Sequence, residues 1–277
     1  MKARMNAAGL ALMALAPLAP ACVPVARGGS AAEGPLGPRT VLVELYTSQG
    51  CSSCPAADAF VRDFPRLGLD RAHVVPLTFH VDYWDDLGWK DPFASPAFTE
   101  RQRRYAQPGR LRSPDGADGL QGIYTPQMIV DGAVHFSGGQ RAVALREIRK
   151  ASVEPAALEI AADAAVQGAR VTVTVRLEPR ASDAFQRPLR VQVALASRGA
   201  RTAVTRGENS GATLEEAAVV RALSAPTPVT SRPAAPLAIT VAKPPSEPWS
   251  AVELAVIVAD EATGHVVAVR AVAVPGA

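Results

Sequence analysis

Two cysteines, Cys51 and Cys54, are the residues of this sequence whose types and spacing could do chemistry. They follow a turn-forming segment at residues 47–50, and we predict that a helix begins at the pair. A helix N-terminus presents unpaired N–H groups and the positive end of the helix dipole, which favour a thiolate. Cys51 is therefore the predicted attacking thiol, and Cys54, further into the helix, is the thiol predicted to resolve a mixed disulfide.

Other uses of the pair stay open from the sequence. A structural disulfide is one, although a ring this small restricts the unfolded chain little. A non-catalytic binding module could carry such a disulfide. Zinc prefers four ligands, but two thiolates and His80 could hold Cu(I), which would suit a copper-binding chaperone. The leading interpretation is a thiol–disulfide oxidoreductase that needs no bound cofactor or resident metal.

The first half of the chain supplies the elements that would position these cysteines. Apolar runs at residues 41–46 and 74–79 predict buried strands, and helices are predicted after Pro55, with Asp58 near its start, and at residues 96–105. Residues 125–130 and 133–137 predict a hairpin joined by Asp131 and Gly132, before a basic helix at 140–150. This is the minimal order of a thioredoxin-like α/β domain, which we place at residues 38–152.

The second half predicts an all-β, sandwich-like domain at residues 155–275. Short alternating segments are separated by proline and glycine turns, as in many β-sandwiches. The predicted strands are residues 157–162, 170–177, 189–196, 236–241, 251–259 and 265–274. Glu208 and Asn209 could join the two domains or line a ligand pocket, but their Gly-Glu-Asn-Ser-Gly context favours an ordinary turn.

An aromatic segment at residues 80–93 lies between the second strand and the helix that follows it. Because parallel strands end along one sheet edge, we expect His80 and Asp82 near Cys51. His80 could then exchange a proton with a leaving thiol, and Trp84 or Trp89 could form an apolar platform for a client. The alternative is that the aromatic side chains cap the core and the acids face water.

Several motifs resemble a secreted, thioredoxin-like bacterial family of unknown function. The shared runs are ELYTSQGCSSCP at residues 44–55, FHVDYW at 79–84, WKDP at 89–92, YTPQ at 124–127 and RGEN at 206–209. The resemblance implies a thioredoxin-like fold, in which a cis proline packs against the disulfide. Pro126, preceded by Thr125, is the matching proline. Residues 112–122 look like an insertion relative to that family.

The N-terminus predicts export. Lys2 and Arg4 precede an apolar stretch at residues 7–18, and we assign residues 1–32 as a signal peptide or lipoprotein signal. Cys22 is either lipidated, which would anchor the protein to a membrane, or a bystander of ordinary cleavage. The expected location is the periplasm or the exterior.

The expected partners follow from the chemistry and from the charge. They are protein or small-molecule thiols and disulfides, with a membrane electron donor if the protein acts as a reductant. The net charge of +3 is spread along the chain without a basic run, so nucleic acid is not an expected partner.

Overall fold

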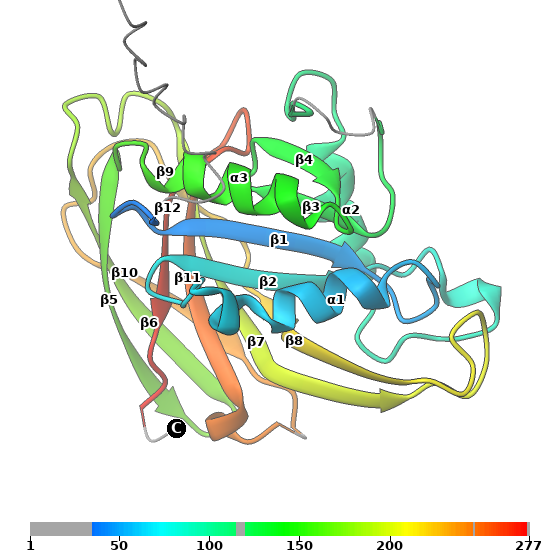
Figure 1. Ribbon diagram of the computed structural model, residues 1–277. Helices are drawn as coiled ribbons and strands as arrows, with labels where there is room; N and C mark the ends of the chain where they lie inside the picture. Colours follow the sequence, from blue (N-terminus) through cyan, green and yellow to red (C-terminus); the bar gives the residue numbers. More distant parts are fainter. Residues whose placement is uncertain (1–34, 115–119, 246, 276–277) are drawn as a thin grey trace, which may run out of the picture.

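The elements predicted for the first half are present in the computed structural model, which describes residues 35–114, 120–245 and 247–275 (Figure 1). They are β1 (Val41–Thr47), α1 (Pro55–Arg62), β2 (Val74–His80), α2 (Pro96–Tyr105), β3 (Gln127–Val130), β4 (Val134–Ser137) and α3 (Arg141–Ser152). Asp131 and Gly132 join β3 to β4 with positive φ angles of 49° and 62°. The export signal, Cys22 and part of the 112–122 segment lie outside the described residues.

The second half is built from strands, as predicted, but two of them were missed. The strands are β5 (Leu158–Gln167), β6 (Arg170–Pro179), β7 (Leu189–Ala203), β8 (Thr213–Leu223), β9 (Thr227–Val229), β10 (Leu237–Ala242), β11 (Val252–Asp260) and β12 (Val266–Val272). No strand was predicted at β8 or β9. In β8 the apolar and polar residues do not alternate regularly, and Ala218 interrupts the extended backbone with a φ of 53°.

One sheet spans both halves of the chain. Its order is β12-β11-β7-β8-β2-β1-β3-β4, with β9 also paired to β7. The connection between the halves is β8, which lies parallel to β2 with Val219 opposite Thr78. The Thr78 hydroxyl donates to the Ala217 carbonyl at 2.8 Å. The assignment of separate domains at residues 38–152 and 155–275 stays a prediction.

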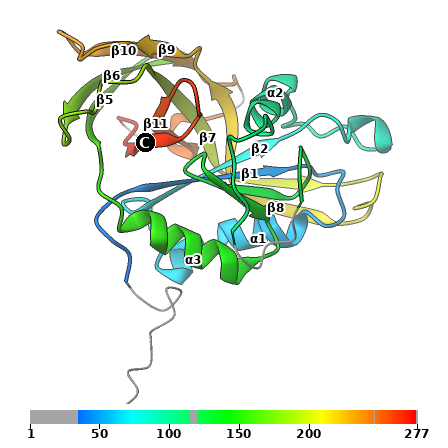
Figure 2. The ribbon, with the colours of Figure 1, turned by 90° about the horizontal axis from the view of Figure 1, so that it is seen from above.

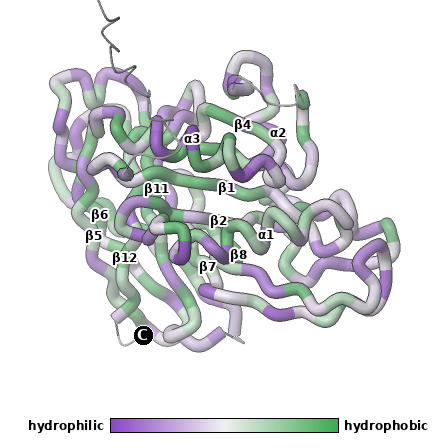
Figure 3. The backbone as a smooth tube through the Cα atoms, viewed as in Figure 1, coloured by the Kyte–Doolittle hydropathy of each residue, from purple (hydrophilic) through white to green (hydrophobic). Residues whose placement is uncertain are grey.

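A smaller sheet, β10-β6-β5, packs on β7 and β11 to form a sandwich. Its core alternates as expected for half-buried strands: Val171, Val173 and Val175 of β6 and Val191 and Val193 of β7 point inward. In Figure 3 the central strands of the sheets are largely hydrophobic, whereas the ends of β7 and β8 next to the turn that joins them are largely hydrophilic. Among the described residues, no helix is long and apolar enough to cross a membrane.

Helices cover both faces of the main sheet near its centre (Figure 2). Helices α1 and α3 lie on one face and α2 on the other. Successive side chains of β1 point to opposite faces of the sheet. Val43 and Leu45 pack in the core on the side of α1 and α3, whereas Leu42 and Tyr46 pack in the core on the side of α2. The strand end that carries the cysteines is therefore held by apolar packing from above and below.

A buried ion pair ties α2 to β1 and β7. The Arg101 guanidinium donates to Glu44 Oε1 at 2.7 Å and to Gln192 Oε1 at 3.0 Å. The Tyr105 hydroxyl donates to the second Glu44 oxygen at 2.7 Å. Glu44 is fully buried, so its charge depends on these partners.

Replacing Arg101 with Met should lower the unfolding free energy by about 3–5 kcal/mol, because it leaves the Glu44 carboxylate buried without its cation. Urea unfolding followed by circular dichroism measures this loss. The control is Arg103→Met on the same helix, since Arg103 is 58% exposed and 4.0 Å from Glu100. That variant should lose no more than about 1 kcal/mol. Equal losses in the two variants would contradict the role given to the buried pair.

Candidate functional site

Cys51 and Cys54 form a disulfide between the end of β1 and the start of α1. Their Cα atoms are 5.5 Å apart. The Cys51 N–H donates to the Ser48 carbonyl and the Cys54 N–H to the Cys51 carbonyl, both at 3.2 Å. Cys54 is the N-cap residue of α1, and Pro55 is its first helical residue. The prediction that the helix begins at the pair is confirmed.

Both cysteines are buried. Each is 0% exposed, while Ser52 and Ser53 between them are exposed. A thiol reagent can therefore reach the Cys51 sulfur only if a covering segment moves. Two segments lie over this loop: the aromatic segment at residues 80–93, and the turn at residues 204–212 that joins β7 to β8.

The aromatic segment reaches the cysteine loop through Trp84. A side chain on Gly50 would come within 3.2 Å of the Trp84 Cβ atom, so the two backbones are in close contact. On its other side, the Trp84 indole N–H donates to the Thr125 hydroxyl at 2.8 Å. Trp84 thereby links the cysteine loop to the Thr125–Pro126 segment.

Thr125 and Pro126 lie beside the start of α1, where the sequence motifs suggested. The bond between them is cis. Pro126 is buried, and its Cβ atom and that of Ala57 lie 3.1 and 2.9 Å from the point where Gly138 would carry a side chain. Gly138 therefore has no room for one, and it lets the chain pass close to both the proline and the helix just after β4 ends.

His80 lies beneath the cysteine loop, but Asp82 does not join it. His80 is fully buried, and its Nδ1 atom is 2.7 Å from Asp91 Oδ2. The same Asp91 oxygen accepts from the Gln49 N–H at 2.8 Å, two residues before Cys51. Asp82 instead accepts a hydrogen bond from Thr99 of α2, because the chain turns away from the sheet edge after Val81.

The aromatic residues fit neither of the two sequence interpretations fully, the exposed apolar platform or the cap on the core with acids that face water. Tyr83, Trp84 and Trp89 are only half-buried, and Tyr83 and Trp84 pack on the core. The alternative in which the acids face water is wrong for Asp91, which is buried beside His80. The indole N–H of Trp89 donates to the Gln49 side chain at 3.2 Å, so this ring is anchored to the cysteine loop.

Two further acids complete a cluster that the sequence did not predict. Asp58 of α1 is buried, and its Oδ2 atom accepts from the Thr47 hydroxyl at 3.1 Å. Glu216 of β8 is buried with its Oε1 atom 3.8 Å from His80 Nε2, and its Oε2 atom accepts from Gln49 Nε2 at 2.9 Å. We call Asp58, His80, Asp91 and Glu216 the buried charge cluster.

Burial and neighbouring charges shift the titration of this cluster. Burial raises the pKa of Asp58 to about 7, and the Glu216 charge adds to the rise. Burial alone would lower the pKa of His80, but the charge and hydrogen bond of Asp91 raise it to about 9. Burial also raises the pKa of Glu216, against the opposing charge of His80. The pKa of Asp91 is lowered, because His80 and the hydrogen bonds outweigh its burial.

The turn between β7 and β8 binds the cysteine loop directly. The Asn209 amide donates to the Gln49 and Cys51 carbonyls at 2.9 and 3.0 Å, and Glu208 accepts from the Ser52 N–H at 2.9 Å. Gly207 packs on Trp89. The sequence favoured an ordinary turn here, and the segment is a turn that also joins the two halves of the chain. Hydrogen bonding from Ser52, by its side chain and by its backbone N–H, lowers the pKa of Glu208.

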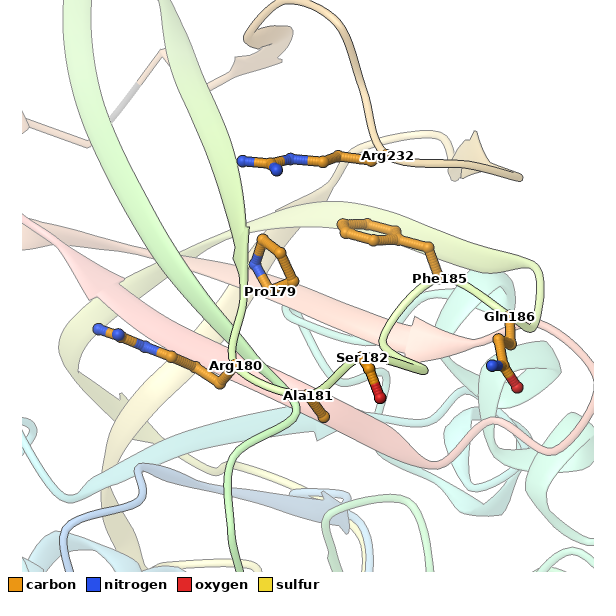
Figure 4. A pocket seen from close by; sticks show the side chains of 7 residues that line it. All are labelled: Pro179, Arg180, Ala181, Ser182, Phe185, Gln186 and Arg232. Atoms are coloured by element: carbon orange, nitrogen blue, oxygen red, sulfur yellow. The ribbon is translucent and has the colours of Figure 1, made fainter.

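A pocket elsewhere in the fold lacks comparable chemistry (Figure 4). It lies beside the loop after β6 and is lined by Pro179, Arg180, Ala181, Ser182, Phe185, Gln186 and Arg232. Each of its cations already has a carboxylate partner: Arg180 pairs with Glu159, and Arg232 with Glu178. The cysteine pair and the segments over it are therefore the candidate site.

Replacing Asn209 with Ala should speed the reduction of the disulfide by dithiothreitol roughly tenfold. Two hydrogen bonds that hold the turn over Cys51 are lost, each worth about 1 kcal/mol, and opening becomes easier. The rate is measured by alkylation and mass spectrometry. The control is Ser210→Ala, since the Ser210 hydroxyl bonds to Thr205 within the turn. An Asn209→Ala rate equal to that of the unaltered protein would contradict this role of the turn.

The raised pKa of Asp58 also predicts how stability depends on pH. Between pH 4 and 7 the folded protein keeps a proton on Asp58 that the unfolded chain has lost, so this group makes stability fall as pH rises. Relative to Asp58→Asn, the oxidised unaltered protein should lose at most about 1.4 kcal/mol per pH unit in this window. Urea unfolding at each pH measures the difference. Parallel curves for the two proteins would contradict the shift, and the exposed Glu215→Gln serves as control.

Comparisons with known proteins agree with the observed architecture. The chain resembles a crystal structure of protein AGR_C_4864 from Agrobacterium tumefaciens, with 26% identity over 84% of this chain and 93% of the other and a TM-score of 0.58. It also resembles HBP35 of Porphyromonas gingivalis in fold, with 14% identity over 84% and 74% of the two chains and a TM-score of 0.55. No curated protein matches it. A family model described as a protein of unknown function, DUF1223, matches residues 42–259, and the chain belongs to that family.

Proposed function

We propose that this protein is an exported thiol–disulfide oxidoreductase that works through Cys51 and Cys54. The observation that carries the proposal is the position of the disulfide: it joins the end of a buried strand to the N-terminus of α1, where a thiolate at Cys51 faces the positive end of the helix. A disulfide that closes so short a loop restricts the unfolded chain little and contributes little to stability, so a role in disulfide exchange explains its presence better than a structural role.

The arrangement around the pair supports a thioredoxin-like assignment for this part of the chain. The element order is β1-α1-β2-α2-β3-β4-α3, and the strands lie in the order β4-β3-β1-β2. Only β1 and β2 are parallel among these four, and helices cover both faces. Pro126 lies beside the start of α1, in the place that the resemblance gives to the proline that packs against the disulfide.

The exchange requires no group from outside the two reactants. A client thiolate attacks the Cys51 sulfur and forms a mixed disulfide, while the Cys51–Cys54 bond breaks and Cys54 leaves with the electron pair. The second client thiolate then attacks the client sulfur, and Cys51 leaves as the thiolate. The client dithiol is oxidised to a disulfide and the cysteine pair is reduced. With a client disulfide, the same steps run in reverse.

The proposed location follows from the N-terminal sequence, and the proposed partners follow from the cysteine chemistry. An export signal at residues 1–32 would deliver the chain to the periplasm or beyond, where disulfides persist. Lipidation of Cys22 would hold it at a membrane surface. The partners are protein or small-molecule thiols and disulfides, and a membrane electron donor if the direction is reductive.

One observation favours a second candidate, a binding module with a structural disulfide. Both cysteines are 0% exposed, as expected of a static bond. The copper-binding alternative has no comparable support. The His80 Nδ1 atom is engaged by Asp91, and within the described parts of the chain no group of three His, Cys, Asp or Glu side chains could hold a metal.

The two candidates differ in what happens when Cys54 is replaced with Ser. If the pair exchanges disulfides, Cys51 of this variant should form mixed disulfides that cannot be resolved, and these are recovered after exposure to glutathione disulfide or a periplasmic extract. Cys51→Ser is the matched control and should trap far less, because Cys54 is the thiol expected to resolve mixed disulfides and not the one that clients attack. If Cys54→Ser traps neither glutathione nor protein under oxidising conditions, the structural disulfide is correct.

A further inference from the structure

Three buried polar atoms that face one region beneath the cysteine loop have no hydrogen-bond partner among the described residues. They are Asp58 Oδ1, His80 Nε2 and Glu216 Oε1. They come from α1, β2 and β8, so folding brings together three distant segments. Buried polar atoms are normally paired, and a cluster of unpaired ones suggests a functional use.

The charges of the cluster cannot all be present at once. Three carboxyl groups and one imidazole are buried together, and full ionisation would leave two uncompensated negative charges away from water. Two other charged side chains near the cluster are half-buried: Asp85, next to Asp91, and Arg221 of β8, which lies over the Phe93 ring and pairs with Glu247. Arg62 of α1 and Arg201 of β7 pair with Glu215 at the surface. The cluster must therefore hold at least one proton on its acids.

Asp58 is the member placed to pass that proton to the cysteine pair. It lies four residues after Cys54, so the two side chains are neighbours on one face of α1. The Asp58 N–H donates to the Cys54 carbonyl at 3.1 Å, and both side chains are buried. Its Oδ2 atom is fixed by Thr47, which leaves Oδ1 for a proton.

We propose that the buried charge cluster is a proton store for the cysteine pair, in which Asp58 gives a proton to Cys54 when the disulfide opens. When Cys54 attacks the mixed disulfide in the reverse direction, Asp58 takes that proton back. Glu216 is a positioning residue: its negative charge keeps Asp58 protonated while the disulfide is intact. His80, hydrogen-bonded to Asp91, supplies a positive charge that limits how far the pKa of Asp58 is raised.

The titration already described agrees with this division of roles. The pKa of Asp58, raised to about 7, keeps the acid protonated in neutral solution for a large share of the molecules. Glu216 is contributed by β8, so the second half of the chain takes part in chemistry at the cysteines. This inference rests on the proposed exchange function and deepens it.

The test is the pH dependence of disulfide reduction by dithiothreitol in the full-length protein. The rate constant of each variant is divided by that of the unaltered protein at the same pH, so that the titration of the reagent cancels. For Asp58→Asn the ratio should be about 0.1 or lower near pH 6, and it should rise towards one as pH passes 7, where Asp58 has lost its proton.

Glu216→Gln and Glu215→Gln provide the matched comparison. Removing the buried Glu216 charge should shift the midpoint of the pH profile of the rate to lower pH, and the rate on the acidic side of the midpoint should not change. Glu215 is adjacent but 55% exposed, and its variant should match the unaltered protein. Glu216→Gln also keeps the test valid if Asp58→Asn does not fold.

The outcomes separate this inference from the proposed function. Ratios for Asp58→Asn that do not vary with pH, or a Glu216→Gln profile without a shift, would overturn the proton store while exchange remains possible. A disulfide that the reagent cannot reduce in the folded protein at any pH would overturn the exchange function itself.

Discussion

The pairing of β8 with β2 is the contact on which the rest of the site depends. It joins strands that are separated by about 140 residues of sequence and makes one sheet of the two halves. It also brings the Glu216 carboxylate to 3.8 Å from His80 Nε2 beneath the cysteine loop. Beyond the sheet, β7 and β8 continue as a hairpin whose turn carries Asn209 to the Cys51 carbonyl. Without this contact, the cysteine pair would lack one of its two covering segments and one of the acids beneath it.

The site combines an apolar support, which stabilises the fold, with buried acids whose desolvation costs folding free energy. Val43 and Leu45 on one face of β1, and Leu42 and Tyr46 on the other, fix the strand that leads to the cysteines. Removing the acids beneath the loop from water opposes folding, unless some of them are protonated or they form hydrogen bonds. A protein can sustain that cost because its large apolar cores stabilise the surrounding sheet, and costs of this kind are concentrated at functional sites.

The sequence predicted the elements next to the cysteines but not the contacts between distant segments. The runs that became β1 and β2 are apolar and bounded by turns, and Ser95 and Pro96 mark the start of α2, so local patterns were sufficient. Strand β8 mixes Glu and Ala with apolar residues and bends at Ala218, and no local pattern reveals that it pairs with β2. From the sequence, Asp58 is only an acid near the start of a helix, where the helix dipole favours it. Its burial could not be predicted, because that depends on how α1 packs on β1 and β8. Asp82 was misplaced because the direction of the chain after β2 is set by tertiary contacts.

The most direct test of the central claim is the reduction potential of the Cys51–Cys54 pair in the folded, mature protein. The protein is equilibrated with glutathione or dithiothreitol mixtures, and the reduced fraction is read by alkylation and mass. A redox-active pair should have a potential between about −120 and −270 mV, the range of exchange-active proteins, with thiols that react when reduced. A potential below about −300 mV with thiols that stay unreactive in the folded state would contradict the account and identify the bond as structural.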